Sequence, residues 1–132
     1  MMMRIYLDAA PIIYYVVEQV APLATVVDAR LSAAGVVRVA SHLTRMECRV
    51  KPLRNGDTAL LQEFDSFFAS TVDEIISLSQ AVIDRATEIR AQFGFKTPDA
   101  IHLAAAIEDA CDVFLTNDQQ LTRFIGIVVE VV

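Results

Sequence analysis

The chain has 132 residues, 55% of them hydrophobic, which is enough to bury the core of one domain and too short for several. Its net charge is -6 and its pI is about 4.7, which excludes a protein that holds nucleic acid over a broad basic surface. No apolar run approaches the roughly 20 residues of a membrane-spanning helix, and no signal peptide opens the sequence, so we expect one cytoplasmic domain over residues 1–132 with no membrane partner.

The first third of the sequence alternates strand and helix patterns. In chain order we expect a strand at Met3–Leu7, a helix from Pro11 to about Val20, a helix from about Pro22 to Gly35, and a strand at Val36–Ala40. Pro11 suits the first turn of a helix, and Gly35 suits a left-handed helix end. Ser41 can then cap a helix that carries Glu47.

The same alternation continues to the last residue. We expect a helix within Asp57–Ser70, a short strand within Val72–Leu78, a long helix closed by Gly94, a helix from Thr97 to about Ala110, a strand at Val113–Thr116, a helical turn near Gln119–Phe124, and a strand at Ile127–Val132. At the start of the fourth of these, Thr97 should cap the helix, Pro98 should open it, and Asp99 should lie in its first turn.

Repeated strand-helix-strand order with continuously apolar strands predicts a parallel sheet covered on both faces. The expected fold is therefore a three-layer α/β/α domain with a central parallel sheet of about five strands. In such sheets the crossovers are right-handed, and ligands bind beyond the carboxyl ends of the strands, where the winding direction switches.

Four carboxylates fall where they can reach that edge. Asp8 directly follows the first strand, and Asp118 follows Val113–Thr116 by two residues, while Asp99 opens the helix before that strand and Glu47 lies about two turns into the helix after the second strand. Singly, each could be a helix cap or a solvated charge. Together, however, like charges at one edge repel unless a cation joins them, which predicts a divalent metal site.

Three segments give this pattern a family resemblance. Three motifs resemble those of PIN domain nucleases and occur in the same order: IYLDAAPIIYY, SHLTRMECRV and KTPDAIHLAAAIEDACDVFLTND. The chain from Met3 to Val131 is similar to the VapC-like toxins of toxin-antitoxin pairs. Matched position by position, Asp8, Glu47, Asp99 and Asp118 correspond to the acidic residues with which the family holds Mg²⁺ or Mn²⁺. The resemblance implies a metal-dependent endoribonuclease that hydrolyses RNA phosphodiesters.

Hard divalent cations favour carboxylate and water oxygens, so the physical chemistry agrees with that implication. We expect Asp8 and Asp99 to be direct metal ligands and Asp118 to bind directly or through water. Glu47 is expected to be either a ligand or the proton acceptor for the attacking water.

Two further residues are expected to support the acids. Thr116 matches the family's threonine before the last aspartate, where its hydroxyl can orient a neighbouring carboxylate. His102 lies three positions after Asp99 on nearly the same helix face, and we interpret it as packed or supporting rather than as a metal ligand. The sequence departs from the family at Ala10, where a small polar residue is usual.

Partner contacts are also implied. Arg45, Arg49 and Lys96 flank the proposed site and could contact RNA phosphates. From Ile12 to Val17 the first helix carries no charge, so either other helices cover it completely or part of it awaits a partner. The resemblance favours the second reading, because VapC-like toxins usually form homodimers and are blocked by an antitoxin segment in an apolar groove.

Two other functions fit parts of the pattern. A catalytically inert PIN-like interaction module is suggested by Ala10 and the acidic pI. An Mg²⁺-dependent phosphotransfer protein is also α/β with an aspartate at a strand end, but Asp8 is followed by Ala9 and Ala10 and so lacks the Asp-x-Asp that one such class needs.

Overall fold

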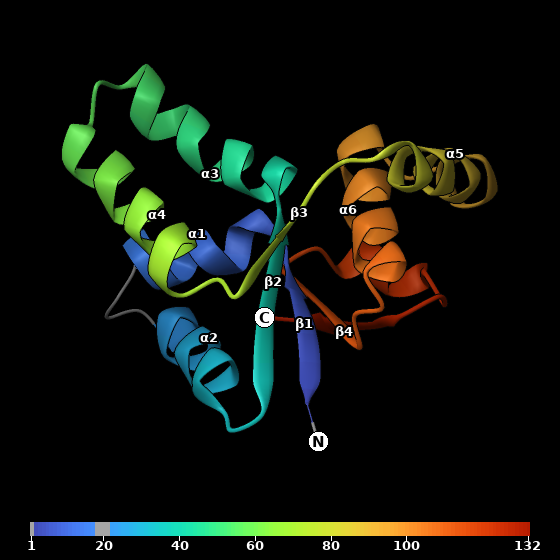
Figure 1. The fold of residues 1–132 in the computed structure, drawn as a ribbon, viewed down its shortest axis with the longest axis horizontal. Helices are drawn as coiled ribbons and strands as arrows, with labels where there is room; N and C mark the ends of the chain where they lie inside the picture. Colours follow the sequence, from blue (N-terminus) through green and yellow to red (C-terminus); the bar gives the residue numbers. More distant parts are fainter. Residues whose placement is uncertain (1, 18–21) are drawn as a thin grey trace.

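All strands of the sheet run parallel, in the spatial order β3-β2-β1-β4-β5 (Figure 1). The strands are β1 (Met3–Leu7), β2 (Val36–Ser41), β3 (Glu74–Ile76), β4 (Val113–Thr116) and β5 (Val128–Val131). The protein is seen here in a computed structural model that describes residues 2–17 and 22–132. Five parallel strands confirm the predicted fold class.

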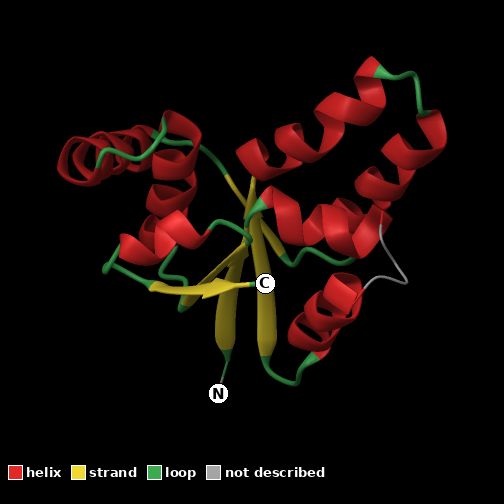
Figure 2. Ribbon diagram, turned by 180° about the vertical axis from the view of Figure 1, so that it is seen from behind, coloured by secondary structure: helices red, strands yellow, loops and turns green. Residues whose placement is uncertain are grey.

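Helices cover both faces of the sheet, as expected for three layers (Figure 2). The helices are α1 (Ala9–Val17), α2 (Pro22–Ser32), α3 (His42–Arg54), α4 (Thr58–Ser70), α5 (Gln80–Phe93), α6 (Thr97–Glu108) and the short 3-10 helix η1 (Gln119–Arg123). Within the described residues no single helix combines the length and apolarity of a membrane crossing, although α1 and α2 taken as a bent pair meet that criterion.

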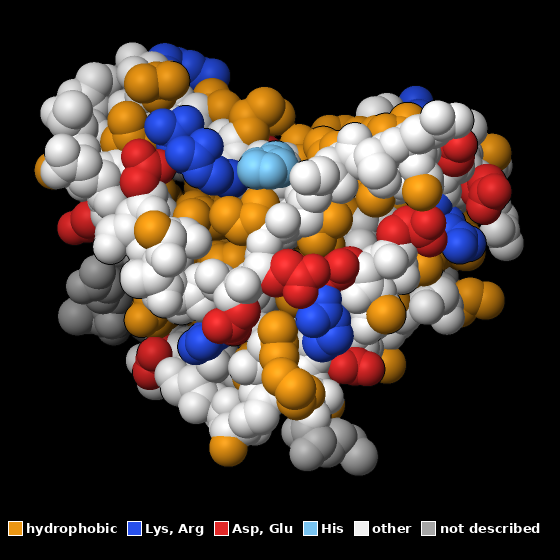
Figure 3. Space-filling view, viewed as in Figure 1, with side chains coloured by type: hydrophobic (Ala, Val, Ile, Leu, Met, Phe, Trp, Pro, Cys, Tyr) orange, Lys and Arg blue, Asp and Glu red, His pale blue; other side chains and the backbone are white. Residues whose placement is uncertain are grey.

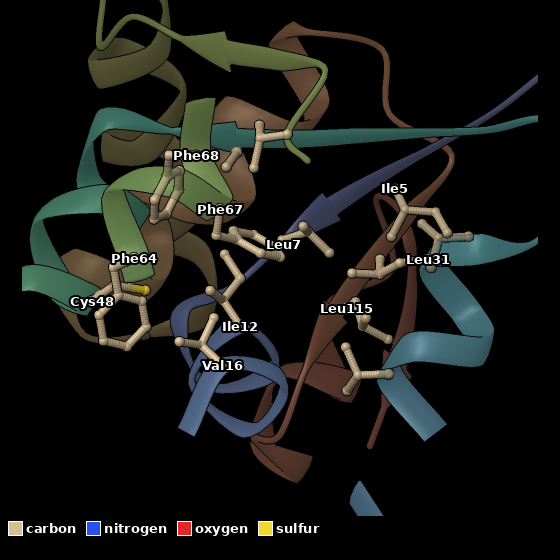
Figure 4. Close-up of a cluster of buried hydrophobic side chains, with 14 residues drawn as sticks. Ile5, Leu7, Ile12, Val16, Leu31, Cys48, Phe64, Phe67, Phe68 and Leu115 are labelled. Carbon is tan, nitrogen blue, oxygen red and sulfur yellow. The ribbon is translucent and has the colours of Figure 1, made fainter. Parts of the chain in front are cut away.

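Alternation along the central strands divides the core into two clusters. Ile5 and Leu7 point from β1 into the cluster beneath α1, α2 and α4, where Phe64 is among the largest buried side chains (Figure 4). Tyr6 points to the opposite face and packs with Phe114 of β4 in the cluster beneath α5 and α6. Because β1 is buried on both faces, a polar group on it must find its partners inside the protein.

Some predicted boundaries need correction. α1 begins at Ala9, two residues before Pro11, and its predicted end at Val20 lies outside the described residues. α2 ends at Ser32 instead of Gly35, which instead has a φ of 80° in the turn that leads into β2. A left-handed glycine therefore marks the turn after the helix and not the last residue of the helix itself.

Of the other three predicted helix caps, two are correct. Ser41 caps α3 in a reciprocal capping box with Thr44, and Gly94 ends α5 with a φ of 73°. The expected Thr97 cap is wrong, because Lys96 occupies the N-cap position without a side-chain hydrogen bond and Thr97 is the first helical residue. The helix tolerates this shift, since the missing N–H of Pro98 costs nothing within the first turn.

One exposed ion pair fixes β3 beside β2. The backbone N–H and the guanidinium of Arg38 donate to the Asp73 carboxylate at 2.8, 2.9 and 3.2 Å, and the Asp73 N–H donates to the Arg38 carbonyl at 2.8 Å. These side-chain hydrogen bonds hold the pKa of Asp73 below its usual value. The charged carboxylate is therefore favoured in the folded protein.

Asp73→Asn should lower the free energy of unfolding at neutral pH by less than about 1 kcal/mol, because the pair is partly exposed. Since the folded-state pKa lies below the unfolded value of about 3.9, the stabilisation is present at pH 7 and is lost as the pH falls through the folded pKa. In urea unfolding, the difference from the unmodified protein should shrink as the pH falls below the unfolded pKa of about 3.9. Asp84→Asn, which removes an exposed carboxylate with no ion pair among the described residues, is the control. A difference that persists undiminished in acid would contradict the assignment.

Candidate active site

The candidate site lies at the point where the winding direction of the sheet reverses, between β1 and β4. From β1 the chain adds β2 and β3 on one side, and it later adds β4 and β5 on the other. The backbone N–H of Asp8 donates to the Leu115 carbonyl at 3.0 Å, so Asp8 leaves β1 beside the end of β4. Open parallel sheets bind their ligands at this kind of position.

Thr116 fixes the Asp8 carboxylate from the neighbouring strand. Its fully buried hydroxyl donates to Asp8 Oδ2 at 2.8 Å and accepts from the backbone N–H of Asp118 at 3.1 Å. The other oxygen, Oδ1, accepts from the N–H of Ala9 at 2.8 Å. The first turn of α1 and the end of β4 together hold Asp8 in one orientation, and the orienting contact expected of Thr116 is present.

Glu47 reaches the site from the second turn of α3. Its Oε1 lies 2.6 Å from Nε2 of His102, which comes from α6 and is 1% exposed. Two acceptors would repel at that distance, so we assign the ring proton to Nε2, which donates a hydrogen bond to Glu47. Asp8 Oδ1 is 3.6 Å from the same nitrogen, and the ligand atoms of the three side chains lie within 4.8 Å of one another.

The buried side chain of Tyr6 contacts His102 at the ring nitrogen that faces away from Glu47. The Tyr6 hydroxyl lies 2.7 Å from Nδ1 of His102 and 2.8 Å from the Ser41 hydroxyl. The Thr44 hydroxyl, 3.3 Å from that of Tyr6, donates to the Leu7 carbonyl at 3.1 Å. His102 is thus held at both ring nitrogens, which fixes the orientation of the ring against Glu47.

Sequence reasoning missed Tyr6. The signal was available, because Tyr6 is a hydroxyl-bearing residue in the middle of a strand expected to be buried on both faces, two positions before Asp8. A buried tyrosine hydroxyl needs a hydrogen-bond partner. Which partner it finds depends on how α3 and α6 approach each other, and that is a tertiary contact.

Asp99 completes the acidic cluster from the first turn of α6. Burial raises the pKa of this half-buried carboxyl above its usual value, and the negative charges of Asp8 and Asp118, and less strongly Glu47, raise it further. The positive charge that His102 can carry opposes these effects. All four predicted acids therefore interact electrostatically, and the apo site disfavours full ionisation of Asp99.

Asp118 connects the cluster to a cavity of about 250 Å³, named here the polar pocket. As N-cap of η1, its carboxylate accepts from the Gln120 N–H at 2.9 Å. The polar pocket is lined by Gly94, Phe95, Lys96, Asp99, Asp118, Gln120, Leu121 and Arg123. One side of the acidic cluster thus opens between the start of α6 and η1.

A second cavity, named here the apolar pocket, opens beside Glu47 on the other side and has a volume of about 220 Å³. α1, α3 and α4 and the turn between the last two supply its lining residues, which are Ile13, Val17, Glu47, Cys48, Lys51, Pro52, Asn55, Asp57, Leu60 and Phe64. Val17 is 50% exposed although it lies on the uncharged helix α1. Neighbouring helices therefore cover that helix only in part, and its open flank faces this pocket.

The three basic residues expected near the site lie in different places. Lys96 lines the polar pocket beside Asp99. Arg45 and Arg49 both pair with Asp65 of α4, at 3.5 and 2.8 Å, and line a separate shallow hollow along α3. Lys96 is thus the one of the three that shares a pocket with the acids.

The side chains present suit a hard divalent cation. Carboxylates from the residue after β1, from α3, from α6 and from the turn after β4 interact electrostatically, and their mutual repulsion falls when a cation is shared among them. Burial raises the pKa of the Cys48 thiol to about 12, so this neighbour of Glu47 stays protonated at neutral pH and does not offer a thiolate. With Nε2 of His102 assigned as the donor to Glu47, this nitrogen has no free lone pair to offer a metal.

Solved structures of low sequence identity share this fold. VapBC2 of Rickettsia felis bound to a promoter DNA fragment aligns with a TM-score of 0.79 at 16% identity, covering 97% of this chain and 98% of the other. A toxin-antitoxin complex of Klebsiella pneumoniae gives 0.72 at 22% identity, with 93% and 94% covered. DNA-bound VapBC of Salmonella typhimurium gives 0.68 at 18%, with 98% of both chains covered. No curated protein matches the sequence.

The sequence itself carries the family assignment. The model of the PIN domain family matches residues 5–126, a span that begins within β1 and includes all four acids, Thr116 and His102. The five-stranded parallel sheet and the acidic cluster at its switch point agree with that match. The chain therefore belongs to the PIN domain family.

Proposed function

We propose that this protein is a metal-dependent endoribonuclease and the toxin of a toxin-antitoxin pair. The observation that carries the proposal is the grouping of Asp8 and Glu47 with His102 within 4.8 Å beside the switch point between β1 and β4. The electrostatic effect of Asp8, Asp118 and Glu47 on Asp99 supports the inclusion of all four predicted acids. Membership of the PIN domain family supports a nuclease. The likeness in fold to two VapBC structures and a toxin-antitoxin complex supports the toxin assignment.

In this proposal Asp8 and Asp99 bind the cation directly, and Asp118 binds it directly or through water. Mg²⁺ is the expected ion and Mn²⁺ can substitute, because both favour carboxylate and water oxygens. When bound, the cation supplies a water of lowered pKa and neutralises charge on the phosphate. The Thr116 hydroxyl keeps Asp8 in its orientation, so that ligand is in place before substrate arrives.

We assign Glu47 the role of proton acceptor for the attacking water. The His102 N–H occupies its Oε1, which leaves Oε2 to take the proton. A carboxylate held at one oxygen keeps the other aimed, and this lowers the cost of ordering it for the reaction. The hydrolysis then needs no nucleophilic side chain, since water attacks the phosphorus in line with the leaving oxygen.

RNA as the substrate and the cytoplasm as the place of action rest on the resemblance to VapC-like toxins. The chain as a whole is acidic, so contact with RNA must be local or mediated by the cation. A site of this kind suits one phosphate at a time and not a long stretch of duplex.

The proposed antitoxin occupies the apolar pocket. Its apolar wall includes Ile13, Val17, Leu60 and Phe64, and Glu47 lies at the edge toward the acids. A partner segment with apolar side chains and one arginine or lysine matches both features. Its basic side chain can pair with the acidic cluster while its apolar side chains are buried in the pocket. A basic partner also complements the net charge of -6.

Self-association is the second proposed contact. Met46, Val50 and Leu53 are 55%, 42% and 63% exposed and recur along α3 at helical spacing. Figure 3 shows hydrophobic side chains along the rim of the notch between the two helical lobes. A homodimer that covers this stripe of α3 removes an apolar surface that a monomer would leave in water.

The first test is cleavage of single-stranded RNA. The purified protein should cleave only with Mg²⁺ or Mn²⁺, and Asp8→Asn and Asp99→Asn should each lower kcat at least about a hundredfold, since each removes a proposed ligand. Circular dichroism should show an unchanged fold, and Asp84→Asn on α5 is the matched control. Undiminished cleavage in either variant, or in excess chelator, would count against the proposal.

Calorimetric titration with Mn²⁺ separates the nuclease from an inert PIN-like module. The nuclease should bind Mn²⁺, and the binding should be weakened in both variants. A protein that neither binds Mn²⁺ nor cleaves RNA would support the inert module instead.

Tyr6→Phe tests the support behind Glu47. The change removes the hydroxyl and keeps the ring stacked on Phe114, whose centroid is 5.3 Å away. We expect kcat to fall about tenfold with little change in KM or Mn²⁺ affinity, because a proton acceptor loses its orientation and no ligand is lost. Tyr15→Phe, a tyrosine that packs on Phe67, is the control. An equal loss in the control, or a change confined to KM, would contradict this role.

Val17→Glu tests the apolar pocket. A carboxylate on its wall should prevent copurification of a small basic partner after expression from the native locus, while RNA cleavage by the isolated protein is unchanged. Val26→Glu on α2 is a matched control, since Val26 is also a helical valine that is 50% exposed. If Val17→Glu retains the partner as well as Val26→Glu does, the partner binds elsewhere.

A further inference from the structure

The two flanks of the acidic cluster differ in chemistry. On the Glu47 side the apolar pocket offers mainly aliphatic and aromatic groups. On the other side, the polar pocket places Lys96 and Arg123 next to Asp99 and Asp118. A ligand of the polar pocket therefore meets two cations and two of the proposed metal ligands in one cavity.

Arg123 is held in position before any ligand arrives. Its guanidinium carbon lies 4.6 Å from the centre of the Phe95 ring, and two of its nitrogens donate to the Phe93 carbonyl at 3.4 Å. Phe95 is itself buried, so the ring that carries the guanidinium is fixed by the core. Stacking on a ring leaves guanidinium N–H groups free to donate to a further acceptor.

Among the described residues, neither cation of the polar pocket has a carboxylate at ion-pair distance. Within the part of the chain that the structure describes, no ion pair joins Lys96 or Arg123 to a carboxylate. Lys96 is exposed at the N-cap of α6 and lines the pocket. Two cations without an ion-pair partner lie in the same pocket as two proposed metal ligands. This combination favours an anion that can also contact a metal, and a phosphate ester is such an anion.

We propose that the polar pocket binds the RNA nucleotide next to the scissile phosphate, with that nucleotide's own phosphate between Lys96 and Arg123. The inference rests on the proposed function and adds a substrate subsite to it. A volume of about 250 Å³ admits one phosphate with its ribose, since sites for larger ligands run from roughly 300 to 1,000 Å³. RNA thus leaves the acidic cluster on the α6–η1 side, away from the apolar pocket.

The test separates binding from cleavage. We would measure the binding of a labelled single-stranded RNA by fluorescence anisotropy with Ca²⁺ in place of Mg²⁺, and single-turnover cleavage with Mg²⁺. Lys96→Ala and Arg123→Ala should each weaken binding and raise the half-saturating protein concentration about tenfold, with the maximal cleavage rate within about threefold. Mn²⁺ affinity should not fall, because no ligand is removed.

Two further variants sharpen the test. Arg123→Lys, which restores the charge, should recover most of the binding. Arg85→Ala removes one positive charge from α5, where Arg85 pairs with Glu88 and Glu108, and should bind RNA like the unmodified protein. The slope of log affinity against log salt should become shallower by about 0.7 in each pocket variant, the share of one phosphate contact on a single strand.

The possible failures are distinguishable. If the unmodified protein cleaves RNA and both pocket variants bind it as well as Arg85→Ala does, the subsite is wrong and the proposed nuclease stands. If no cleavage occurs with Mg²⁺ or Mn²⁺, the proposed function fails, and the anisotropy measurement still decides whether the pocket holds a nucleotide. A loss of binding equal to that in Arg85→Ala would reflect total charge alone and would also overturn the subsite.

Discussion

Mutual repulsion among carboxylates at one edge of the sheet is the constraint around which the site is built. The raised pKa of the Asp99 carboxyl, caused by burial and then by its acidic neighbours, is the direct expression of that repulsion. The fold tolerates it because Asp8 accepts hydrogen bonds from Thr116 and Ala9, and Glu47 accepts one from His102. Each of these donors offsets part of the cost of holding an anion away from water. The remainder is relieved by whatever positive group the cluster binds.

The supporting contacts pass through the core on one face of the sheet. Tyr6 alternates with Ile5 and Leu7, so its ring enters the cluster beneath α6 while its hydroxyl reaches His102. Ser41 and Thr44, which form the capping box of α3, contact the same hydroxyl. The cap that starts α3 and the histidine that holds Glu47 are therefore parts of one buried network. A change in how α3 packs would move Glu47 and His102 together.

The sequence was most informative where geometry follows from topology alone. Asp8 and Asp118 could be placed at one edge because parallel strands end at the same edge, and the capping of Ser41 and Gly94 follows from local backbone preference. The contact between Glu47 and His102 could not be foreseen, because it depends on the angle between two helices that are 55 positions apart in the chain. Arg45 and Arg49 illustrate the same limit, since spacing gave no sign that Asp65 of α4 would pair with both.

The different chemistry of the two pockets bears on how such a protein could be controlled. In the proposed assignment a partner segment enters beside Glu47 and a nucleotide enters beside Asp118, so the two ligands need not compete for the same cavity. They meet only at the acidic cluster. A basic side chain of the partner would neutralise the same carboxylates that a divalent cation neutralises, so the two would compete for them. Inhibition would then act by putting a basic side chain in place of the metal ion. The contribution of this contact to the partner's affinity would depend mainly on the negative charge of the carboxylates.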